Sequence, residues 1–223
     1  SIVETGTWNG GRAIEMAMAA FQHVDEVTYT GYDLFEEATE ALDKAELNSK
    51  AHNSLEAVEA RLNEFAGAME SQGKTFNFTL FKGDTKKQLK NTKVDFAYID
   101  GGHSEDTVNH DYEMLKESDV IVLDDYVSKD ENGNDPGEEF YGVNKIIEKF
   151  EGRKKVLPSQ DRIVEGGITH LAVVINNDNI PDIPENFTNV PIVIQPRDCM
   201  PKEDIQNNVK QNTKIINKWV GRA

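Results

Sequence analysis

The feature that most constrains the fold of this chain is an alternation between two hydrophobic periods, which persists over the first 175 residues. Stretches with apolar residues at every second position, typical of strands, are followed by stretches with apolar residues three and four apart, typical of helices. This alternation favours parallel strands joined by helical crossovers. We therefore predict an α/β fold with a doubly wound, mostly parallel seven-stranded sheet and helices on both faces.

The alternating segments give the expected order of elements. The strands are residues 1–5, 27–33, 76–81, 94–100 and 119–125, followed by two near 162–165 and 169–175. Helices are expected between them, including a long one that Gly73 ends and one that Ser104 caps. We take residues 1–177 as one domain and residues 178–223 as a Pro-rich linker with a C-terminal helical extension.

The segment from residue 127 to residue 141 breaks the alternation. It is acidic, contains glycines and has no hydrophobic period, which indicates a mobile loop and a candidate lid. A calcium loop built on Asp130, Asn132 and Asn134 is disfavoured, because Asp135 stands where the sharp turn of such a loop requires glycine.

The charge of the chain limits its partners. A formal net charge of −16 argues against nucleic acid, because binding to a phosphate backbone usually depends on a basic patch. Cys199 is the only cysteine, which favours a reducing, cytoplasmic setting, and no apolar run approaches the length of a membrane span. We expect a small-molecule partner, no nucleic acid and no membrane, and we leave a homo-oligomer open. Because the sequence has no initiator Met and opens on a strand, we also expect a longer parent protein.

Glycines and acidic residues follow the first three expected strands, where ligands bind in doubly wound sheets. Gly6, Gly10 and Gly11 allow a tight turn and a close approach of the backbone to a ligand. Their spacing, G-x-x-x-G-G, departs from the G-x-G-x-x-G of dinucleotide sites and disfavours NAD. Asp33 and Asp84 end the next two strands, and an acidic residue at the first of these positions can accept hydrogen bonds from ribose hydroxyls. Together these features predict a nucleoside-like cofactor.

Carboxylates also end the fourth and fifth strands. Asp100 ends the fourth strand, Asp124 and Asp125 end the fifth, and His103 lies three residues after Asp100. Clustered like charges raise one another's pKa unless a positive charge lies among them. Taken singly, Asp100 could shape a turn and the other two could be solvated loop residues. Taken together with His103, they indicate a cation site.

These segments resemble the class I S-adenosylmethionine-dependent methyltransferases. The stretch from Glu4 to Gly11, ETGTWNGG, is similar to their first motif, E-x-G-x-x-x-G. The segments GYDLFEE and AYIDGGHSEDTVNHDYEML...DVIVLDDY are similar to the macrocin O-methyltransferase-like (methyltransferase 24-like) branch, which methylates sugar hydroxyls with a divalent metal. The resemblance runs from residue 1 to about residue 175 and is most specific between the fourth and fifth strands.

The resemblance implies a role for each strand-end residue. Glu4 and Gly6 would contact the methionine part of S-adenosylmethionine, Asp33 the ribose and Asp84 the adenine. The implied cofactor-binding set is Glu4, Gly6, Thr7, Gly10, Gly11, Asp33, Leu34, Asp84 and Thr85. Asp100, Asp124 and Asp125 would ligate Mg²⁺ or Mn²⁺, and His103 and Asp100 would be the catalytic residues, with His103 as the general base.

The chemistry of the residues agrees with these roles. Carboxylate oxygens are hard ligands that suit Mg²⁺ or Mn²⁺, and a cation bound to a hydroxyl lowers its pKa. His103, with an ordinary pKa of about 6.5, could accept the proton. We therefore predict an S-adenosylmethionine-dependent O-methyltransferase that acts on a hydroxyl of a small molecule, a sugar or glycosylated metabolite.

Two alternatives remain open. One is an enzyme of other chemistry on the same scaffold, although an oxidative iron site would need two histidines and a carboxylate, and only His103 is well placed. The other is a non-catalytic domain that binds a nucleotide or glycan within a larger protein. Three more residues have expected roles: Trp8 either stacks on a ligand or packs on the sheet, His110 is solvated, and Asp111 either supports the site from behind its ligands or, as we favour, lies at the surface.

Overall fold

Strands and helices alternate along the chain, as the hydrophobic periods predict. The computed structural model describes residues 1–48, 50–135, 137–158, 161–162 and 167–184. The elements are β1 (Ile2–Thr5), α1 (Gly11–Ala20), β2 (Glu26–Asp33), α2 (Glu40–Ala45), α3 (Leu55–Glu70), β3 (Thr75–Lys82), α4 (Thr85–Gln88), β4 (Phe96–Ile99), α5 (Glu105–Leu115), β5 (Val120–Ser128), α6 (Gly142–Lys149), β6 (Arg153–Val156), β7 (Asp161–Arg162) and β8 (Ile168–Ile175). Short 3-10 turns cover Phe35–Glu37 and Glu138–Phe140.

The strands form one doubly wound sheet, which confirms the predicted fold class. Their order is β3-β2-β1-β4-β5-β8-β6, and the two-residue strand β7 pairs with β8 beside this path. The pairs from β3 across to β5 are parallel, whereas β8 runs antiparallel to both β5 and β6. β1, β4 and β5 are therefore direct neighbours, and their carboxyl ends meet at one edge of the sheet.

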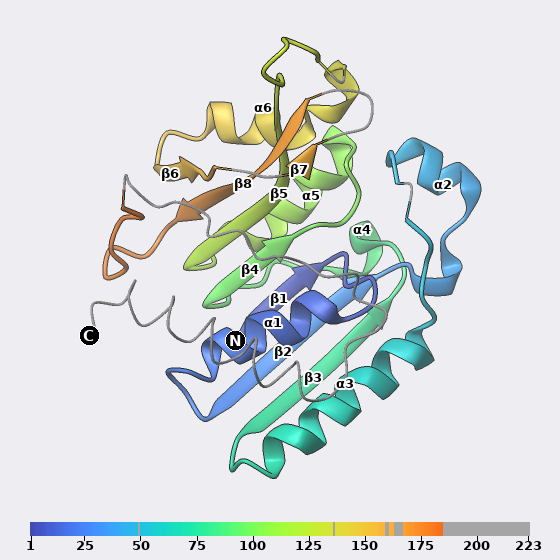
Figure 1. Ribbon diagram of the computed structural model, residues 1–223, viewed down its shortest axis with the longest axis vertical. Helices are drawn as coiled ribbons and strands as arrows, with labels where there is room; N and C mark the ends of the chain where they lie inside the picture. The colour runs from blue at the N-terminus through green and yellow to red at the C-terminus, as the bar shows by residue number, and fades with distance from the viewer. Residues whose placement is uncertain (49, 136, 159–160, 163–166, 185–223) are drawn as a thin grey trace.

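Helices lie on both faces of the sheet (Figure 1), and the side chains of the strands form buried hydrophobic clusters on both faces. On one face Ile2, Tyr29 and Phe76 pack with residues of α1 and α3, such as Ala17 and Leu62. On the other face the apolar residues of β1, β4, β5 and β8 pack against α5 and α6; they include Val3, Ile99, Leu123, Val174, Val108, Leu115 and Ile147. Each large apolar side chain buried in this way contributes about 1.5–3 kcal/mol relative to an exposed one.

The outer strands differ from the prediction. The seventh strand of the path is β6, which sequence reasoning missed because its residues, Arg153 to Val156, are mostly basic and show no alternation. The strand expected near 162–165 corresponds to β7 at Asp161–Arg162, and residues 163–166 lie outside the described residues. The last predicted strand is confirmed as β8.

β5 also runs further than predicted. It does not end at Asp125 but continues to Ser128, with a register shift between Leu123 and Tyr126 against β8. Asp125 has φ 59°, an unusual left-handed conformation for a residue other than glycine. A bulge of this kind re-aims side chains and breaks the alternation, so the sequence pattern ended the strand too early.

The segment after β8 returns across the sheet. Ile180 and Ile183 pack against a cluster that contains Tyr98 and Val122, and Arg153 donates hydrogen bonds to the carbonyls of residues 177 and 180. Most of the expected helical extension, residues 185–223, lies outside the described residues. Within the described residues, no helix is long and apolar enough to span a membrane.

Candidate active site

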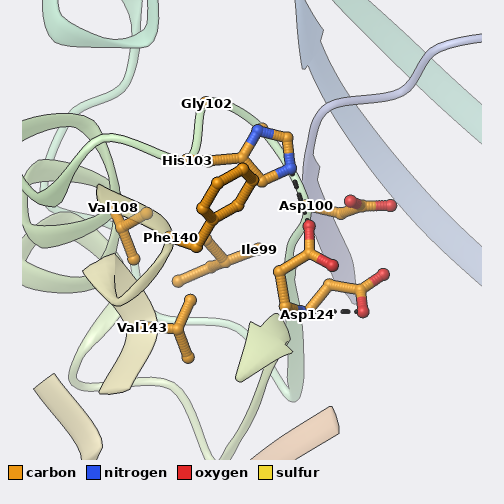
Figure 2. Close-up of a pocket in the computed structure, with 10 residues that line it drawn as sticks. Ile99, Asp100, Gly102, His103, Val108, Asp124, Phe140 and Val143 are labelled. Carbon is orange, nitrogen blue, oxygen red and sulfur yellow. Dashed lines mark hydrogen bonds and ion pairs between the residues drawn. The ribbon is translucent and has the colours of Figure 1, made fainter. Parts of the chain in front are cut away.

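The predicted carboxylates gather at the carboxyl ends of β4 and β5. The register pairs Ile99 with Leu123, so the residues that follow on the two strands share one edge of the sheet. A pocket there is lined by Asp100, Gly101, Gly102, His103, Asp124 and Asp125, with Ile99, Val108, Phe140 and Val143 as its apolar wall. Figure 2 shows the side chains of Asp100 and Asp124 on one side of this pocket and those of Phe140 and Val143 on the other.

His103 is held between two acceptors. Its Nε2 lies 2.7 Å from Oδ2 of Asp125, and its Nδ1 lies 2.7 Å from the backbone carbonyl of Glu46. Burial alone would lower the pKa of His103, but the hydrogen bond and the charge of Asp125 raise it to about 9. In this arrangement both ring nitrogens donate, so His103 would have to release Asp125 before it could act as the predicted general base.

The pKa values of the three carboxylates of the pocket are shifted in opposite directions. Burial and the charge of Asp124 raise the pKa of Asp100 to about 7, while Lys50 opposes the rise. Burial and the charge of Asp125 also raise the pKa of Asp124. Burial opposes ionisation of Asp125 as well, but its hydrogen bond with His103 lowers its pKa overall. The cluster therefore retains unbalanced negative charge, which a cation would relieve.

Two residues on the α1 face of the sheet support Asp124. The hydroxyl of Tyr98 donates to Oδ2 of Asp124 at 2.9 Å. The guanidinium of Arg12, on α1, lies 5.1 Å from the centre of the Tyr98 ring. Arg12 also interacts by charge with Asp124 and Asp100. These two side chains orient one carboxylate and supply a nearby positive charge.

The glycine turn, residues 6–11 after β1, directly contacts the loop after β4, which begins at Asp100. Gly6 has φ +85°, and a Cβ added there would lie 1.8 Å from the carbonyl oxygen of Asp100. No other residue fits at this position, so the requirement for glycine arises from the loop after β4. The turn also places the start of α1 beside the carboxylates.

Most backbone N–H groups of the glycine turn already have acceptors in the chain. Gly6 and Thr7 donate to the carbonyl of Tyr32, Trp8 donates to Asp33, Gly10 donates to the carbonyl of Thr7, and Gly11 donates to Asn9. The turn is therefore not a phosphate cradle of free amides. A ligand that brings its own donors, such as an ammonium group, suits it better.

Glu4 lies behind the turn with an acceptor available. Its side chain is fully buried, Tyr29 donates its hydroxyl to Oε2, and Oε1 has no hydrogen-bond partner among the described residues. Burial raises the pKa of Glu4 to about 8. An orphaned buried oxygen is costly in the free protein and fits a site that a polar ligand completes.

Asp33 connects the two turns of the predicted cofactor site. One of its oxygens accepts from the Trp8 N–H and the other from the Phe35 N–H, each at 2.7 Å. Trp8 and Phe35 both have φ 49°, so the carboxylate stabilises two unusual backbone conformations. Leu34 immediately follows and is the N-cap residue of the 3-10 turn that begins at Phe35. Each carboxylate oxygen keeps a further lone pair, which leaves Asp33 able to accept from a ribose hydroxyl.

The remaining predicted cofactor residues have evident structural roles. Asp84 caps α4 by accepting from the Lys86 N–H at 2.9 Å, and Thr85 is the first residue of that helix. Thr7 is buried and its hydroxyl lies 3.2 Å from that of Tyr29, so only its backbone faces the turn. Gly10 is the left-handed cap of α1, which begins at Gly11. The ligand contacts predicted for these residues stay predictions.

Several expectations about single residues are corrected. Asp111 is not at the surface: it is 1% exposed, and burial raises its pKa to about 6. His110 is only half-exposed, and its Nε2 is buried without a hydrogen-bond partner in the part of the chain that the structure describes. Trp8 donates its indole N–H to the carbonyl of Ala51 at 2.8 Å, with the Lys50 ammonium 5.7 Å from its ring centre. The indole is thus held by the segment after α2.

The donor set suits a divalent cation in its chemistry, but its present arrangement is not that of a metal site. Among the described residues, no three or more His, Cys, Asp or Glu side chains are grouped so as to hold a metal ion. Asp125 is engaged with His103, and Asp124 with Tyr98. Hard oxygen donors with raised pKa values are nevertheless the ligands that Mg²⁺ or Mn²⁺ would take.

Four residues that sequence reasoning missed complete the site: Arg12, Glu46, Lys50 and Tyr98. Tyr98 could have been noticed as the one hydroxyl-bearing side chain in the apolar strand FAYI. The other three come from elements far from Asp100 in the sequence. No spacing rule within one segment connects them.

A doubly wound sheet with glycines and acids at the carboxyl ends of its strands defines a Rossmann-like nucleoside-binding class. A family model described as a methyltransferase domain, methyltransferase 24, matches residues 3–126. This range is more than half of the 223 residues. The chain therefore belongs to this methyltransferase family. The resemblance to the class I S-adenosylmethionine-dependent methyltransferases is thereby confirmed.

Solved structures with a similar fold include three O-methyltransferases. A putative O-methyltransferase from Klebsiella pneumoniae is 17% identical, with 79% of this chain and 73% of that chain covered and a TM-score of 0.47. TomG from Streptomyces achromogenes, in complex with SAM, has the same identity, coverage and TM-score. The enzyme from Bacillus cereus, in complex with SAH, is 16% identical over 78% of this chain and 73% of that chain, with a TM-score of 0.46. A search of curated proteins finds no match.

Proposed function

We propose that this chain transfers the methyl group of S-adenosylmethionine to a hydroxyl oxygen of a small molecule. A divalent cation would assist at the acidic cluster, which consists of Asp100, Asp124 and Asp125. The observation that carries the proposal is the direct contact between Gly6 of the glycine turn and the carbonyl of Asp100. It makes the predicted cofactor turn and the carboxylates parts of one site, so a sulfonium at the turn would lie beside the acceptor position. Proximity of this kind is the main requirement of an in-line methyl transfer.

The chain's own residues would supply most of the cofactor's environment. Carbonyl oxygens of the glycine turn and the free Oε1 of Glu4 would accept from the methionine ammonium group, and Asp33 would accept from the ribose hydroxyls. The acidic cluster favours a positively charged sulfonium over the neutral thioether product. The methyl group moves from sulfur to oxygen, and the carbon–sulfur bond breaks with its electron pair left on sulfur.

Asp100, Asp124 and Asp125 would hold the cation, which would lower the pKa of the acceptor hydroxyl. His103, whose side chain lines the same pocket, would accept the hydroxyl proton once it has released Asp125 and lost one ring proton. Phe140 and Val143 would pack against the apolar part of the acceptor. A sugar or glycosylated metabolite is the acceptor class that the resemblance of the segments around Asp100 and Asp124 supports.

Calorimetry tests the cofactor half of the proposal. S-adenosylmethionine should bind the intact chain with a dissociation constant below about 1 mM, equivalent to more than about 4 kcal/mol of binding free energy. Gly6→Ala should lose this affinity, since its Cβ would displace the turn from the Asp100 carbonyl. An absence of binding heat from the wild-type chain at millimolar cofactor would refute the proposal.

The cation half is tested by Mn²⁺ binding, read by electron paramagnetic resonance. Asp124→Asn should weaken Mn²⁺ binding at least about tenfold while leaving cofactor affinity in place, because it removes one charged ligand. Asp178→Asn is the matched control: it removes an exposed carboxylate after β8, beyond the opposite edge of the sheet. Equal Mn²⁺ affinity in both variants would contradict a cation at the acidic cluster.

A further inference from the structure

Glu46 connects two parts of the site that are distant in sequence. It follows α2, and its carboxylate accepts hydrogen bonds from the first turn of α5: from the Ser104 N–H at 3.0 Å, the Ser104 hydroxyl at 3.1 Å and the Thr107 hydroxyl at 2.7 Å. Its backbone carbonyl accepts from Nδ1 of His103 at 2.7 Å. A single residue thus holds both the start of α5 and the imidazole that precedes it.

We propose that Glu46 is a positioning residue for the methyl transfer: it docks the segment after α2 on the first turn of α5 and thereby holds His103 against Asp125. The catalytic meaning of this role rests on the proposed function, whereas the docking itself does not. Without the Glu46 carbonyl, Nδ1 of His103 would lose its acceptor and the ring could rotate away from Asp125.

The fit around Gly102 supports a specific docking. A Cβ added at Gly102 would lie 2.3 Å from Oε2 of Glu46 and 2.9 Å from Cγ2 of Thr107. A side chain at residue 102 would therefore displace the Glu46 carboxylate from its present position. The φ of this glycine is not in the left-handed region, so backbone conformation gives no separate reason for it.

The charge of Glu46 makes the docking strong. Hydrogen bonds to an ionised carboxylate are about twice as strong as neutral ones. Negative charge at the start of a helix is also favourable, because the first N–H groups of the helix point towards it. Ser104 caps α5 from within the chain by accepting from the Thr107 N–H, and Glu46 adds a second, tertiary cap over the same turn.

The docked segment also contacts the cofactor turn. The carbonyl of Ala51 accepts from the indole N–H of Trp8, and the charge of Lys50 lowers the pKa of Asp125 and opposes the rise at Asp100. α2 lies beyond the carboxyl ends of β1 and β2, where the two halves of the site meet (Figure 1). Release of Glu46 would therefore loosen the segment that contacts both halves.

Nuclear magnetic resonance of the intact chain tests the role without an acceptor substrate. Glu46→Ala and Glu46→Gln are compared with Glu40→Gln, which changes an exposed glutamate on the same helix. The measurements are the long-range ¹H–¹⁵N signals of the His103 imidazole at fixed pH and the hydrogen exchange of the Thr107 and Val108 amides. Calorimetry with S-adenosylhomocysteine is run on each variant.

We expect Glu46→Ala to shift the Nδ1 signal of His103 and to speed exchange at Thr107 at least about tenfold, since the first turn of α5 loses the carboxylate that accepts from the Ser104 N–H and from the Ser104 and Thr107 hydroxyls. Glu46→Gln should show a smaller change of both, because its amide oxygen can still accept from one hydroxyl, and Glu40→Gln should show none. Unchanged His103 signals in Glu46→Ala, with or without lower stability, would overturn the proposal.

If Glu46→Ala does not fold, Glu46→Gln decides: a shifted Nδ1 signal supports the positioning role, and an unshifted one overturns it. Absence of S-adenosylhomocysteine binding by the wild-type chain would count against the proposed function. The imidazole signals test the positioning role independently of that result.

Discussion

At the scale of single residues, the site is defined by the charges that burial leaves unbalanced. Asp100 and Asp124 have raised pKa values, whereas Asp125 has a lowered one because it bonds to His103. These opposite shifts within one pocket divide the carboxylates into two kinds. Asp125 is paired with an imidazole. The ionised forms of Asp100 and Asp124 are disfavoured, and a bound cation would stabilise them.

Asp125→Asn should remove the cause of the high His103 pKa. Titration of the His103 signals by nuclear magnetic resonance should give a pKa of about 9 in the wild-type chain. In Asp125→Asn the pKa should fall well below that of the wild-type chain, because burial is then opposed only by the Glu46 carbonyl and the charge of Asp100. The signals of the other histidines should stay in place. A wild-type pKa at or below the ordinary value would show that the ion pair does not form in solution.

Glu4→Gln should change how stability depends on pH. The folded chain raises the pKa of Glu4 from 4.5 to about 8, so between these values it binds a proton that the unfolded chain has lost. Stability contributed by this proton is complete at acid pH and falls as pH rises through the window, by up to about 1.4 kcal/mol per pH unit.

The Gln variant lacks this dependence. Its unfolding temperature minus that of the wild-type chain should therefore increase from pH 5 to pH 8. Thermal unfolding at both pH values measures the difference. A constant difference between the two proteins would mean that Glu4 is ionised in its buried position.

At the scale of elements, the bulge in β5 sets the direction of the acidic pair. After Leu123 the register of β5 against β8 shifts, and beyond the end of the β4 pairing Asn144 of α6 bonds to Val127. The Asn144 side chain accepts from the Val127 N–H at 2.9 Å and donates to the Val127 carbonyl at 2.8 Å. A side chain thus imitates a neighbouring strand beyond the end of β4.

Asn144→Leu should destabilise the chain by about 2 kcal/mol or more, because it leaves two buried backbone groups of Val127 without partners. Urea unfolding measures the change. Asn109→Leu, at an exposed position on α5, provides the comparison and should change stability by less than about 0.5 kcal/mol. Similar stabilities of the two variants would show that water replaces the Asn144 contacts.

The elements also show where sequence reasoning works and where it stops. Long alternating segments such as residues 75–82 and the Ser104 cap of α5 are predictable, because local period and capping chemistry define them. β6 and α2 are not, since β6 depends on pairing with β8 and α2 is only six residues long. The end of β5 was misplaced because a bulge hides the continuation of a strand.

At the scale of the whole molecule, parallel topology explains why part of the site was predictable. The carboxyl ends of adjacent parallel strands must meet, so the sequence alone predicts that Asp100 and Asp124 lie together. Arg12, Lys50 and Glu46 approach the same point from α1 and from the segment after α2. Their contributions depend on how crossover segments pack, which no local pattern in the sequence encodes.

The net charge of the whole chain attracts cations, as the carboxylates of the site do. A net charge of −16 raises the local concentration of cations around the chain, which favours both a sulfonium and a divalent metal. Mn²⁺ affinity should therefore fall as monovalent salt increases from about 0.05 to 0.5 M, since screening weakens the long-range part of the attraction. Paramagnetic resonance titrations at the two salt concentrations measure this. An affinity independent of salt would restrict the attraction to the ligands themselves.

The central claim is that one site at the ends of β1, β4 and β5 holds both a sulfonium nucleoside and a divalent cation. Diffraction from crystals grown with S-adenosylhomocysteine and MnCl₂, with anomalous data for manganese, tests it most directly. We expect the nucleoside along the glycine turn with its ribose at Asp33, and a manganese peak within ligand distance of Asp100, Asp124 and Asp125. A nucleoside bound elsewhere, or manganese absent from these carboxylates while present in the crystal, would contradict it.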